Sequence, residues 1–324
     1  MKKRVLATII TLAILSVLCL TGCGEKKDDK TINIGYFNNI THAQALYMKS
    51  QGSLETALGE EVTVNWTAFN AGPAEVEALF AESIDIGYIG PVPAINANVK
   101  SDGDVQILSG ATKGGAILIK RAGVNIQSVA DLSGKTVAIP QIGNTQHLGL
   151  LYLLEQNGLK PTTEGGDVTV SAVANADVAN MMDRGDIDAA FVPEPWGATL
   201  LEMGAEMVLD YDEVFYEGHY DVAVVVVRKE FMEEHPEYVK AFLAQHEAAT
   251  LAINSNAAIA ISQINAELNE ATGKSLSQSV IEEAFGRIGV STDLNKESVA
   301  EFAKIGVTNA FIGEAPEESE LYVD

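Results

Sequence analysis

Short hydrophobic or alternating segments recur along the chain, and longer stretches with helical spacing of apolar residues separate them. The short segments lie at 31–34, 62–64, 84–89, 116–119, 136–139, 168–170, 187–192 and 221–227. Segments of this length, bounded by turn residues, predict strands, and the longer stretches predict helices. Strands that alternate with helices form parallel sheets with helices on both faces. The pattern therefore predicts an α/β protein with parallel sheets.

The order of these elements repeats within the chain. The strand–helix–strand–helix–strand order of residues 31–89 returns about 105 residues later, over residues 136–192. Matching positions include Asn39 and Asn144, His42 and His147, and Asn70 and Asn175. Chance explains any single match in a helix-rich chain, but a match of the whole order favours duplication. The repeat therefore predicts two α/β lobes.

Two further segments indicate where the chain passes between these lobes. Gly114 and Gly115 precede the strand at 116–119, and the strand at 221–227 contains four consecutive valines. We expect lobe I to comprise residues 31–115 and 228–324, and lobe II to comprise 116–227. Ligands of open α/β sheets bind beyond the carboxyl ends of the strands. Two lobes that face each other there define one cleft.

The N-terminal segment has the features of an export signal. Residues 1–4 are cationic and residues 5–20 are apolar, a length too short to span a bilayer comfortably. Leu20-Thr21-Gly22-Cys23 resembles the lipobox of bacterial lipoproteins. We expect a signal peptide at 1–22, lipidation of Cys23 and a tether at 23–30, which would anchor the protein on the extracytoplasmic face of the cell membrane. A plain signal peptide that contains a cysteine is the alternative.

The charge balance and the cysteines exclude several classes of function. The formal net charge is −24, and removal of Lys2, Lys3 and Arg4 makes it −27. Such a surface repels nucleic acid, although recessed backbone N–H groups can still bind a small anion. Both cysteines, Cys19 and Cys23, lie in the N-terminal segment. The mature chain therefore has no thiol for a disulfide or for catalysis.

The motifs of catalysis, metal binding and cofactor binding are missing from the sequence. It contains neither a G-x-S-x-G nor an H-E-x-x-H pattern. Gly134-Lys135-Thr136 lacks the first glycine of a phosphate-binding loop, because Val129 occupies that position. We therefore expect no enzyme activity, no metal and no cofactor.

Four segments carry a resemblance to a known family. Residues 69–75, 84–91, 139–146 and 191–196 resemble the binding proteins of nitrate, sulfonate and taurine ABC transporters. The resemblance extends from about residue 31 to residue 312. It implies a type II periplasmic-binding-protein fold, in which two lobes close on a ligand. Members of this kind bind sulfonates, taurine, nitrate, bicarbonate or pyrimidine precursors of thiamine.

Four loops are expected to face the cleft. Those at 36–39 and 141–146 each open a helix, so unpaired N–H groups and a partial positive charge would point at an anion. Helix capping is the alternative role for Asn144 and Thr145. The candidate ligand-binding residues are Tyr36, Asn38, Asn39, Gly90, Pro91, Val92, Thr112, Gln141, Gly143, Asn144, Thr145, Gln146, Glu194, Trp196 and His219.

Two of these residues suggest contacts with the organic part of a ligand. Trp196 could form a flat wall for an organic tail, or pack in the core. Glu194 could meet a cation such as an amino group, or remain solvated, or form a hydrogen bond between the lobes.

These observations predict the extracytoplasmic solute-binding component of an ABC importer. We expect a monomer that captures an alkanesulfonate or taurine and delivers it to a membrane permease, with a separate cytoplasmic ATPase. Nitrate, bicarbonate or a thiamine pyrimidine precursor are alternative ligands. A ligand sensor for a membrane receptor, or a pyrimidine-precursor synthase of the same fold, are alternative functions.

Overall fold

The structure is a computed structural model that describes residues 30–323. The chain divides into two units, Met1–Thr31 and Ile32–Asp324, and the fold is that of the second. The expected signal peptide, Cys23 and all of the expected tether except Lys30 lie outside the described residues. Among the residues that are described, no helix has both the length and the apolar character needed to cross a membrane.

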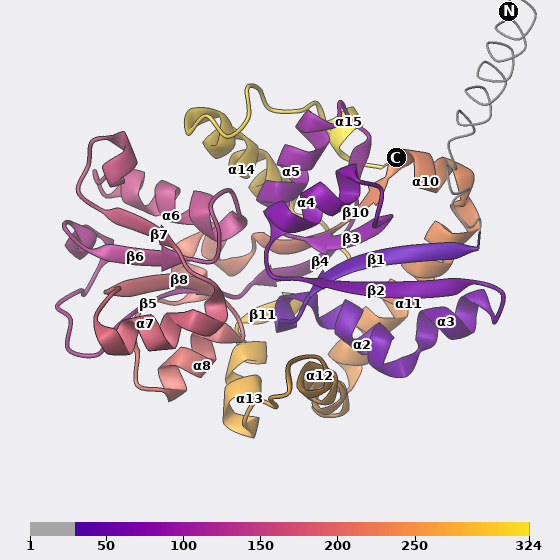
Figure 1. The fold of residues 1–324 in the computed structure, drawn as a ribbon, viewed down its shortest axis with the longest axis horizontal. Coiled ribbons are helices and arrows are strands. Elements are labelled where there is room, and N and C mark those ends of the chain that lie inside the picture. The colour runs from indigo at the N-terminus through magenta and orange to yellow at the C-terminus, as the bar shows by residue number, and fades with distance from the viewer. Residues whose placement is uncertain (1–29, 324) are drawn as a thin grey trace, which may run out of the picture. The chain divides into compact units, whose positions relative to one another are not determined.

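Two mixed sheets form the framework (Figure 1). The first has the strand order β11-β4-β10-β3-β1-β2 and the second has the order β7-β6-β8-β5-β9. The strands of the first sheet are β1 (Thr31–Phe37), β2 (Thr63–Phe69), β3 (Ile86–Ile89), β4 (Val105–Gly114), β10 (Asp221–Arg228) and β11 (Ile288–Val290). Those of the second are β5 (Ala116–Lys120), β6 (Thr136–Ile139), β7 (Thr169–Ala172), β8 (Ala189–Pro193) and β9 (Glu206–Leu209). Lobe I and lobe II denote the first and second sheet with the helices that cover them.

Helices connect and cover the strands. The α-helices are α2 (Ala43–Gln51), α3 (Ser53–Leu58), α4 (Gly72–Phe80), α5 (Pro91–Lys100), α6 (Thr145–Gln156), α7 (Val178–Arg184), α8 (Trp196–Glu202), α9 (Tyr211–Val214), α10 (Lys229–Glu234), α11 (Pro236–Ser255), α12 (Ala257–Thr272), α13 (Gln278–Gly286), α14 (Lys296–Thr308) and α15 (Glu318–Leu321). The 3₁₀ helices are η1 (Ile40–His42), η2 (Val129–Leu132), η3 (Thr162–Glu164), η4 (Asn175–Asp177) and η5 (Tyr216–Gly218).

The valine run of β10 explains how lobe I is layered. Val224 and Val226 pack in the cluster that includes residues of α4 and α5, and Val225 and Val227 pack in the cluster that includes residues of α2 and α11. Successive side chains of a strand point to opposite faces. Both faces of the sheet are therefore covered, as Figure 1 shows for α4 and α5 on one side and α2 on the other.

The predicted repeat is visible in the strand order, but the sheets are not purely parallel. In lobe I, β1 is parallel to β3 and β10 is antiparallel to β3. In lobe II, β6 is parallel to β8 and β5 is antiparallel to β8. β5 and β10, the strands that enter each lobe from the other, are antiparallel to β8 and β3, and β11 also pairs antiparallel with β4. The expectation of parallel sheets was wrong for these strands, and for β5 and β10 the reason is that a chain that crosses between lobes enters the new sheet in the opposite direction.

The chain crosses between the two lobes twice, at two segments that differ in character. β4 leads into β5 through Gly114 and Gly115, whose φ angles are +68° and +74°, values that favour glycine. Residues 221–227, expected at the end of lobe II, form β10 of lobe I instead. The reason is that β10 pairs with β3 and β4 along most of its length, so the return crossing precedes it.

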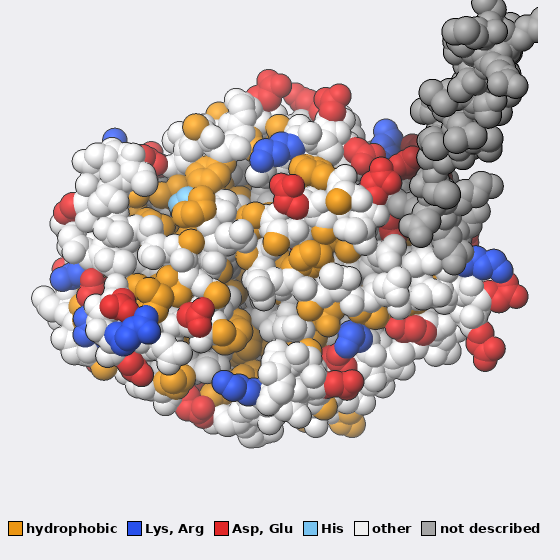
Figure 2. Space-filling view, in the orientation of Figure 1, with side chains coloured by type: hydrophobic (Ala, Val, Ile, Leu, Met, Phe, Trp, Pro, Cys, Tyr) orange, Lys and Arg blue, Asp and Glu red, His pale blue; other side chains and the backbone are white. Residues whose placement is uncertain are grey.

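Acidic side chains are spread over the face shown in Figure 2, and they do not gather into one patch. This distribution fits the formal net charge of −24. The face shown therefore offers no continuous basic track to a polyanion.

Candidate ligand-binding site

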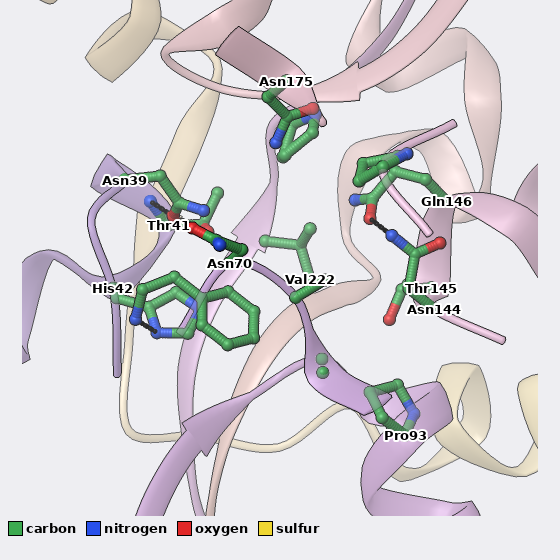
Figure 3. Close-up of a pocket in the computed structure, with 16 residues that line it drawn as sticks. Asn39, Thr41, His42, Asn70, Pro93, Asn144, Thr145, Gln146, Asn175 and Val222 are labelled. Carbon is green, nitrogen blue, oxygen red and sulfur yellow. Dashed lines mark hydrogen bonds between the residues drawn. The ribbon is translucent and has the colours of Figure 1, made fainter. Parts of the chain in front are cut away.

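A pocket lies where the carboxyl ends of strands from both lobes meet (Figure 3). Phe37 and Pro193 end β1 and β8, and Gly90 and Pro140 directly follow β3 and β6. The lining residues are Phe37, Asn39, Thr41, His42, Asn70, Ala71, Gly72, Gly90, Pro93, Pro140, Asn144, Thr145, Gln146, Asn175, Pro193 and Val222. The pocket therefore occupies the position in which open α/β sheets bind ligands.

The pocket is small in this conformation. Its cavity volume is about 30 Å³. One water molecule needs about 10–15 Å³ on this measure, so only about two or three waters fit. A larger ligand can enter only if the lobes separate or the lining side chains move.

In lobe I, a polar turn connects β1 to α2. The Oδ1 atom of Asn39 accepts hydrogen bonds from the backbone N–H of Thr41, at 3.1 Å, and from the Thr41 hydroxyl. The Nδ1 atom of His42 accepts the backbone N–H of Phe37 at 3.1 Å, and the two rings stack with centroids 4.3 Å apart. The capping asparagine and the histidine hold this turn at the pocket wall.

Lobe II builds its facing wall in the same way. The Oδ1 atom of Asn144 caps α6 by accepting the backbone N–H of His147 at 2.8 Å. The Nδ1 atom of His147 accepts the backbone N–H of Gly143 at 3.1 Å. Figure 3 shows Asn39, Thr41 and His42 on one side of the pocket and Asn144, Thr145 and Gln146 on the other.

Both histidines are neutral at physiological pH. Burial lowers the pKa of His42 to about 3 and that of His147 to about 4. Because each Nδ1 atom accepts a backbone N–H, the ring proton is on Nε2. The histidines therefore shape the two turns and bring no positive charge to the pocket.

Two lining atoms have hydrogen-bonding capacity that no protein group satisfies. The Oγ1 atom of Thr145 and the Oδ1 atom of Asn175 are buried without a partner among the described residues. Thr145 is only 6% exposed. Buried polar atoms in native proteins almost always have a partner, so these two are available to a ligand or to water.

The lobes touch at the pocket. A Cβ atom placed on Gly90 of lobe I would overlap Oγ1 of Thr145 in lobe II. Gly90 has φ −68° and ψ 151°, an ordinary extended conformation. The requirement for glycine here arises from the close approach of the other lobe and not from the backbone angles.

Several helices begin at the pocket. α4 starts at Gly72, α5 follows Gly90, and α6 starts at Thr145. The first turns of helices expose unpaired N–H groups and carry a partial positive charge. All the side chains in the described lining are formally uncharged once His42 is neutral. The pocket therefore suits an anion held by neutral donors.

Five of the candidate ligand-binding residues line the pocket: Asn39, Gly90, Asn144, Thr145 and Gln146. The other ten lie elsewhere: Tyr36, Asn38, Pro91, Val92, Thr112, Gln141, Gly143, Glu194, Trp196 and His219.

Several of these ten support the pocket from behind. Thr112 is buried and donates its hydroxyl proton to the Thr41 carbonyl at 2.6 Å. Tyr36 is buried in the core of lobe I. Pro91 is the first residue of α5, and the carbonyl of Gln141 accepts the N–H of Asn144 at 3.4 Å. These contacts fix the turns whose neighbouring residues reach the pocket.

Glu194 and Trp196 make their contacts outside the pocket lining. The carboxylate of Glu194 accepts a hydrogen bond from Nη1 of Arg287 at 2.9 Å, which links lobe II to the segment before β11 of lobe I. Trp196 packs against a core cluster of lobe II that contains Ile117. Of the roles considered for them, the contact between lobes and the core packing match these positions.

The remaining four candidates are also outside the lining. Val92 and Gly143 border a second, smaller and mainly apolar cavity between α5, α6 and α14. The Oδ1 atom of Asn38 is buried without a partner. His219 is exposed, and its carbonyl accepts Nδ2 of Asn295 at 2.8 Å.

Asn70 and Asn175 line the pocket but were not among the candidates. They follow β2 and β7, which occupy matching places in the two sheets. The repeat had already paired these two asparagines. Treating matched polar residues after matched strands as site residues would have identified both.

A metal centre is not formed by the described residues. Within residues 30–323, no group of three or more histidine, cysteine, aspartate or glutamate side chains is arranged to hold a metal ion.

The chain is similar to several known proteins. It is 36% identical to the taurine-binding periplasmic protein of Escherichia coli K12 over 184 residues, which are 56% of this chain and 54% of that protein. The match thus spans about half the length of that relative. It is 27% identical to a putative aliphatic sulfonates-binding protein of Bacillus subtilis 168 over 248 residues, which are 75% of this chain and 71% of that protein.

The fold also matches a solved structure. The periplasmic aliphatic sulphonate-binding protein of Escherichia coli superimposes with a TM-score of 0.72 at 23% identity, over 91% of this chain and 92% of that one. This match confirms the predicted periplasmic-binding-protein fold with two α/β lobes. The model of the NMT1-like family matches residues 25–265. The chain is therefore a member of the NMT1-like family.

Proposed function

We propose that the protein is the extracytoplasmic solute-binding component of an ABC importer and that it captures a small sulfonate, either an alkanesulfonate or taurine. The observation that carries this proposal is the pocket between the lobes, which is lined by neutral donors and bordered by helix N-termini. The sulfonate-binding and taurine-binding relatives give the ligand class.

The lining suits a sulfonate head group. A sulfonate has three acceptor oxygens and remains ionised throughout the physiological pH range. Amide groups, hydroxyls and backbone N–H groups at helix starts can donate to such oxygens without bringing a cation. The amide side chains in the lining are Asn39, Asn70, Asn144, Gln146 and Asn175.

Ligand binding is coupled to closure of the lobes. A ligand that contacts both walls of the pocket interacts more strongly with the closed conformation than with an open one. It therefore shifts the population toward the closed state. The surface formed by the two closed lobes is the one that we expect a permease to recognise.

The same proposal covers the finer points of location and partners. We place the protein on the extracytoplasmic face of the cell membrane, anchored through lipidated Cys23, as a monomer. Its partners are a membrane permease and a separate cytoplasmic ATPase. We place β10 and the residues after it in lobe I and the segment from β5 through β9 in lobe II. Catalysis is not part of the proposed role, because the described lining contains no cysteine, serine or carboxylate.

Isothermal titration calorimetry of the purified full-length protein tests the ligand class. The panel comprises ethanesulfonate, propane-1-sulfonate, taurine, nitrate, bicarbonate and a thiamine pyrimidine precursor. We expect binding of at least one sulfonate and a matching rise in the melting temperature by mass action. Binding of nitrate, bicarbonate or the pyrimidine, without binding of any sulfonate, would overturn the proposal.

Two variants separate the contribution of Asn144 to ligand binding from its contribution as the N-cap of α6. Asn144→Ala removes the N-cap of α6, and Asn157→Ala, at the C-terminal end of the same helix, removes the hydrogen bond to the Leu153 carbonyl. Loss of a cap costs about 1 kcal/mol of stability. We expect only Asn144→Ala to weaken sulfonate binding, by about tenfold for one lost polar contact. Equal affinities of the two variants would remove Asn144 from the site.

A further inference from the structure

We propose that the pocket selects sulfonates with an uncharged tail and discriminates against those that carry an ammonium group, such as taurine. This inference rests on the proposed function and narrows the ligand class of the same site. It concerns the second functional group of the ligand, for which the described pocket lining offers no counter-charge.

The described lining contains no carboxylate that could pair with an ammonium group. Two carboxylates lie directly beside lining residues in the sequence. Glu194 follows Pro193, and Asp221 precedes Val222. Both carboxylates are fully buried, with 0% of the side chain exposed. Either carboxylate would have to turn toward the pocket to meet a ligand.

Both oxygens of Glu194 are already engaged. Oε1 accepts from Nη1 of Arg287 at 2.9 Å, and Oε2 accepts from the backbone N–H of Ala198 at 2.9 Å. Turning this side chain into the pocket would leave the Arg287 guanidinium without one partner and the first turn of α8 without its acceptor. Removing one member of a buried ion pair is strongly unfavourable.

Both oxygens of Asp221 are engaged in the same manner. Oδ1 accepts from Nζ of Lys113 at 3.0 Å, and Oδ2 accepts from the backbone N–H of Asn295 at 2.7 Å. Lys113 also donates to the carbonyl of Asp293 at 2.7 Å. This pair joins β4 to β10, and turning Asp221 toward a ligand would break both hydrogen bonds.

The nearby cations are likewise engaged. Arg287 donates through Nε to Asp210 at 2.9 Å and through Nη2 to Glu283 at 2.7 Å, in addition to Glu194. Arg287 is thus held by three carboxylates outside the lining, and Lys113 by one. The described lining itself carries no formal charge.

Helix dipoles at the pocket favour the anionic end of a ligand and oppose a cationic end. The N-termini of α4, α5 and α6 border the pocket, and Thr145 at the start of α6 is 94% buried with an unpartnered Oγ1. A helix N-terminus repels a cation. An ammonium group also has three N–H donors to satisfy. The unpartnered Oδ1 of Asn175 can accept only part of that need and carries no charge.

The direct test compares two ligands of nearly equal shape. Taurine and propane-1-sulfonate differ chiefly by an ammonium group in place of a methyl group. Calorimetry with the purified full-length protein should give a Kd for propane-1-sulfonate about tenfold or more below that for taurine, because the ammonium must be desolvated without a counter-ion. Taurine binding as tightly or more tightly would overturn the inference and leave the proposed function standing. If neither of these two sulfonates binds and ethanesulfonate does not bind either, both the inference and the proposed function fail.

A variant with a carboxylate in the pocket provides the converse test. Asn175→Asp preserves the shape of the side chain, and we expect it to shift the affinity ratio toward taurine by about tenfold. Asn70→Asp makes the same change on an exposed residue of the opposite wall. Asn256→Asp, exposed at the junction of α11 and α12, adds the same charge away from the pocket and should leave the ratio unchanged. An unchanged ratio in both pocket variants, with unchanged melting temperatures, would contradict the inference.

Discussion

At the scale of single residues, two loops beside the pocket differ in where their side chains make contacts. The loop at 141–146 supplies three lining residues, and the loop at 194–196 supplies none. Glu194 turns inward because its partner is Arg287, which is 93 residues away in the sequence. The residues of the loop itself do not identify a partner that is so distant in the sequence. The direction of a loop side chain therefore could not be predicted from the loop alone.

The burial of Glu75 is explained neither by the family resemblance of residues 69–75 nor by the pocket. This residue is fully buried, and both carboxyl oxygens lack a partner among the described residues. It lies over Gly35 and Gly87, which are paired in register between β1 and β3, and a Cβ on either glycine would overlap its Oε1. Burial raises its pKa well above the ordinary value of 4.5. Burial therefore favours the protonated form of this carboxyl in the folded protein.

The buried carboxyl of Glu75 makes the stability of the protein depend on pH. Because the pKa of Glu75 is raised in the folded state, its contribution to stability is fully present below pH 4.5 and is lost as the pH rises toward the folded value. Glu75→Met keeps a similar volume and removes the unpartnered oxygens. We expect it to raise the free energy of unfolding at neutral pH by about 1–3 kcal/mol.

Urea unfolding at about pH 4.5 and pH 7.5 measures this effect, and the gain should be smaller at the lower pH. Glu77→Met on the exposed face of α4 is the control, and it should not stabilise the protein. A loss of stability in Glu75→Met at both pH values would show that the carboxyl has a partner in solution.

At the scale of elements, the internal repeat predicted most of the architecture. It paired the turns that begin η1 and α6, and both turns do use an asparagine cap and a histidine acceptor. It did not predict the place of β10, because a run of valines specifies a strand buried on both faces but not the sheet that buries it. Sheet membership depends on pairing with β3 and β4, which are more than 100 residues earlier in the chain.

His147 gives a test of how one of these turns is held. Its Nδ1 atom accepts the Gly143 N–H, and burial lowers its pKa to about 4. His147→Leu removes that acceptor, so we expect the free energy of unfolding near pH 7.5 to fall by about 1–3 kcal/mol.

The difference in free energy of unfolding between His147→Leu and the wild type should become smaller as the pH falls. The unfolded chain takes up a proton at this histidine below pH 6.5, and the folded protein does so only near pH 4. The wild type therefore loses stability from this group over that interval, by about 1.4 kcal/mol per pH unit, and the variant does not. Urea unfolding at several pH values measures the stability difference between the variant and the wild type. Asn157→Ala, at the C-terminal end of the same helix, changes no ionisable group and is the control; its stability deficit should not narrow on acidification.

At the scale of the whole molecule, the two lobes are joined by more than the crossing strands. Arg287 precedes β11 of lobe I and donates to Glu194 and Asp210 of lobe II. Arg287→Met would leave Glu194 buried without its counter-ion, and we expect a loss of about 3–5 kcal/mol.

The pair can be tested by a double variant. Arg287→Met combined with Glu194→Met replaces both partners with apolar side chains, and most of the lost stability should return. Chemical denaturation of the two single variants and the double variant gives the coupling energy. Additive losses would show that the two charges do not depend on each other.

The contact between Gly90 and Thr145 controls how closely the lobes can approach. Gly90→Ala is compatible with the backbone conformation, whose φ is −68°, so a conformation with separated lobes should tolerate it. The added Cβ would overlap Thr145 Oγ1 only when the lobes are closed. The substitution therefore penalises the closed state selectively, and we expect ligand affinity to fall by about tenfold or more.

Gly286→Ala, where an added Cβ meets no atom within 4 Å, is the control for calorimetry. If Gly90→Ala binds ligand as tightly as the wild type, the bound state is more open than the conformation described, and the sulfonate does not require contact with both walls.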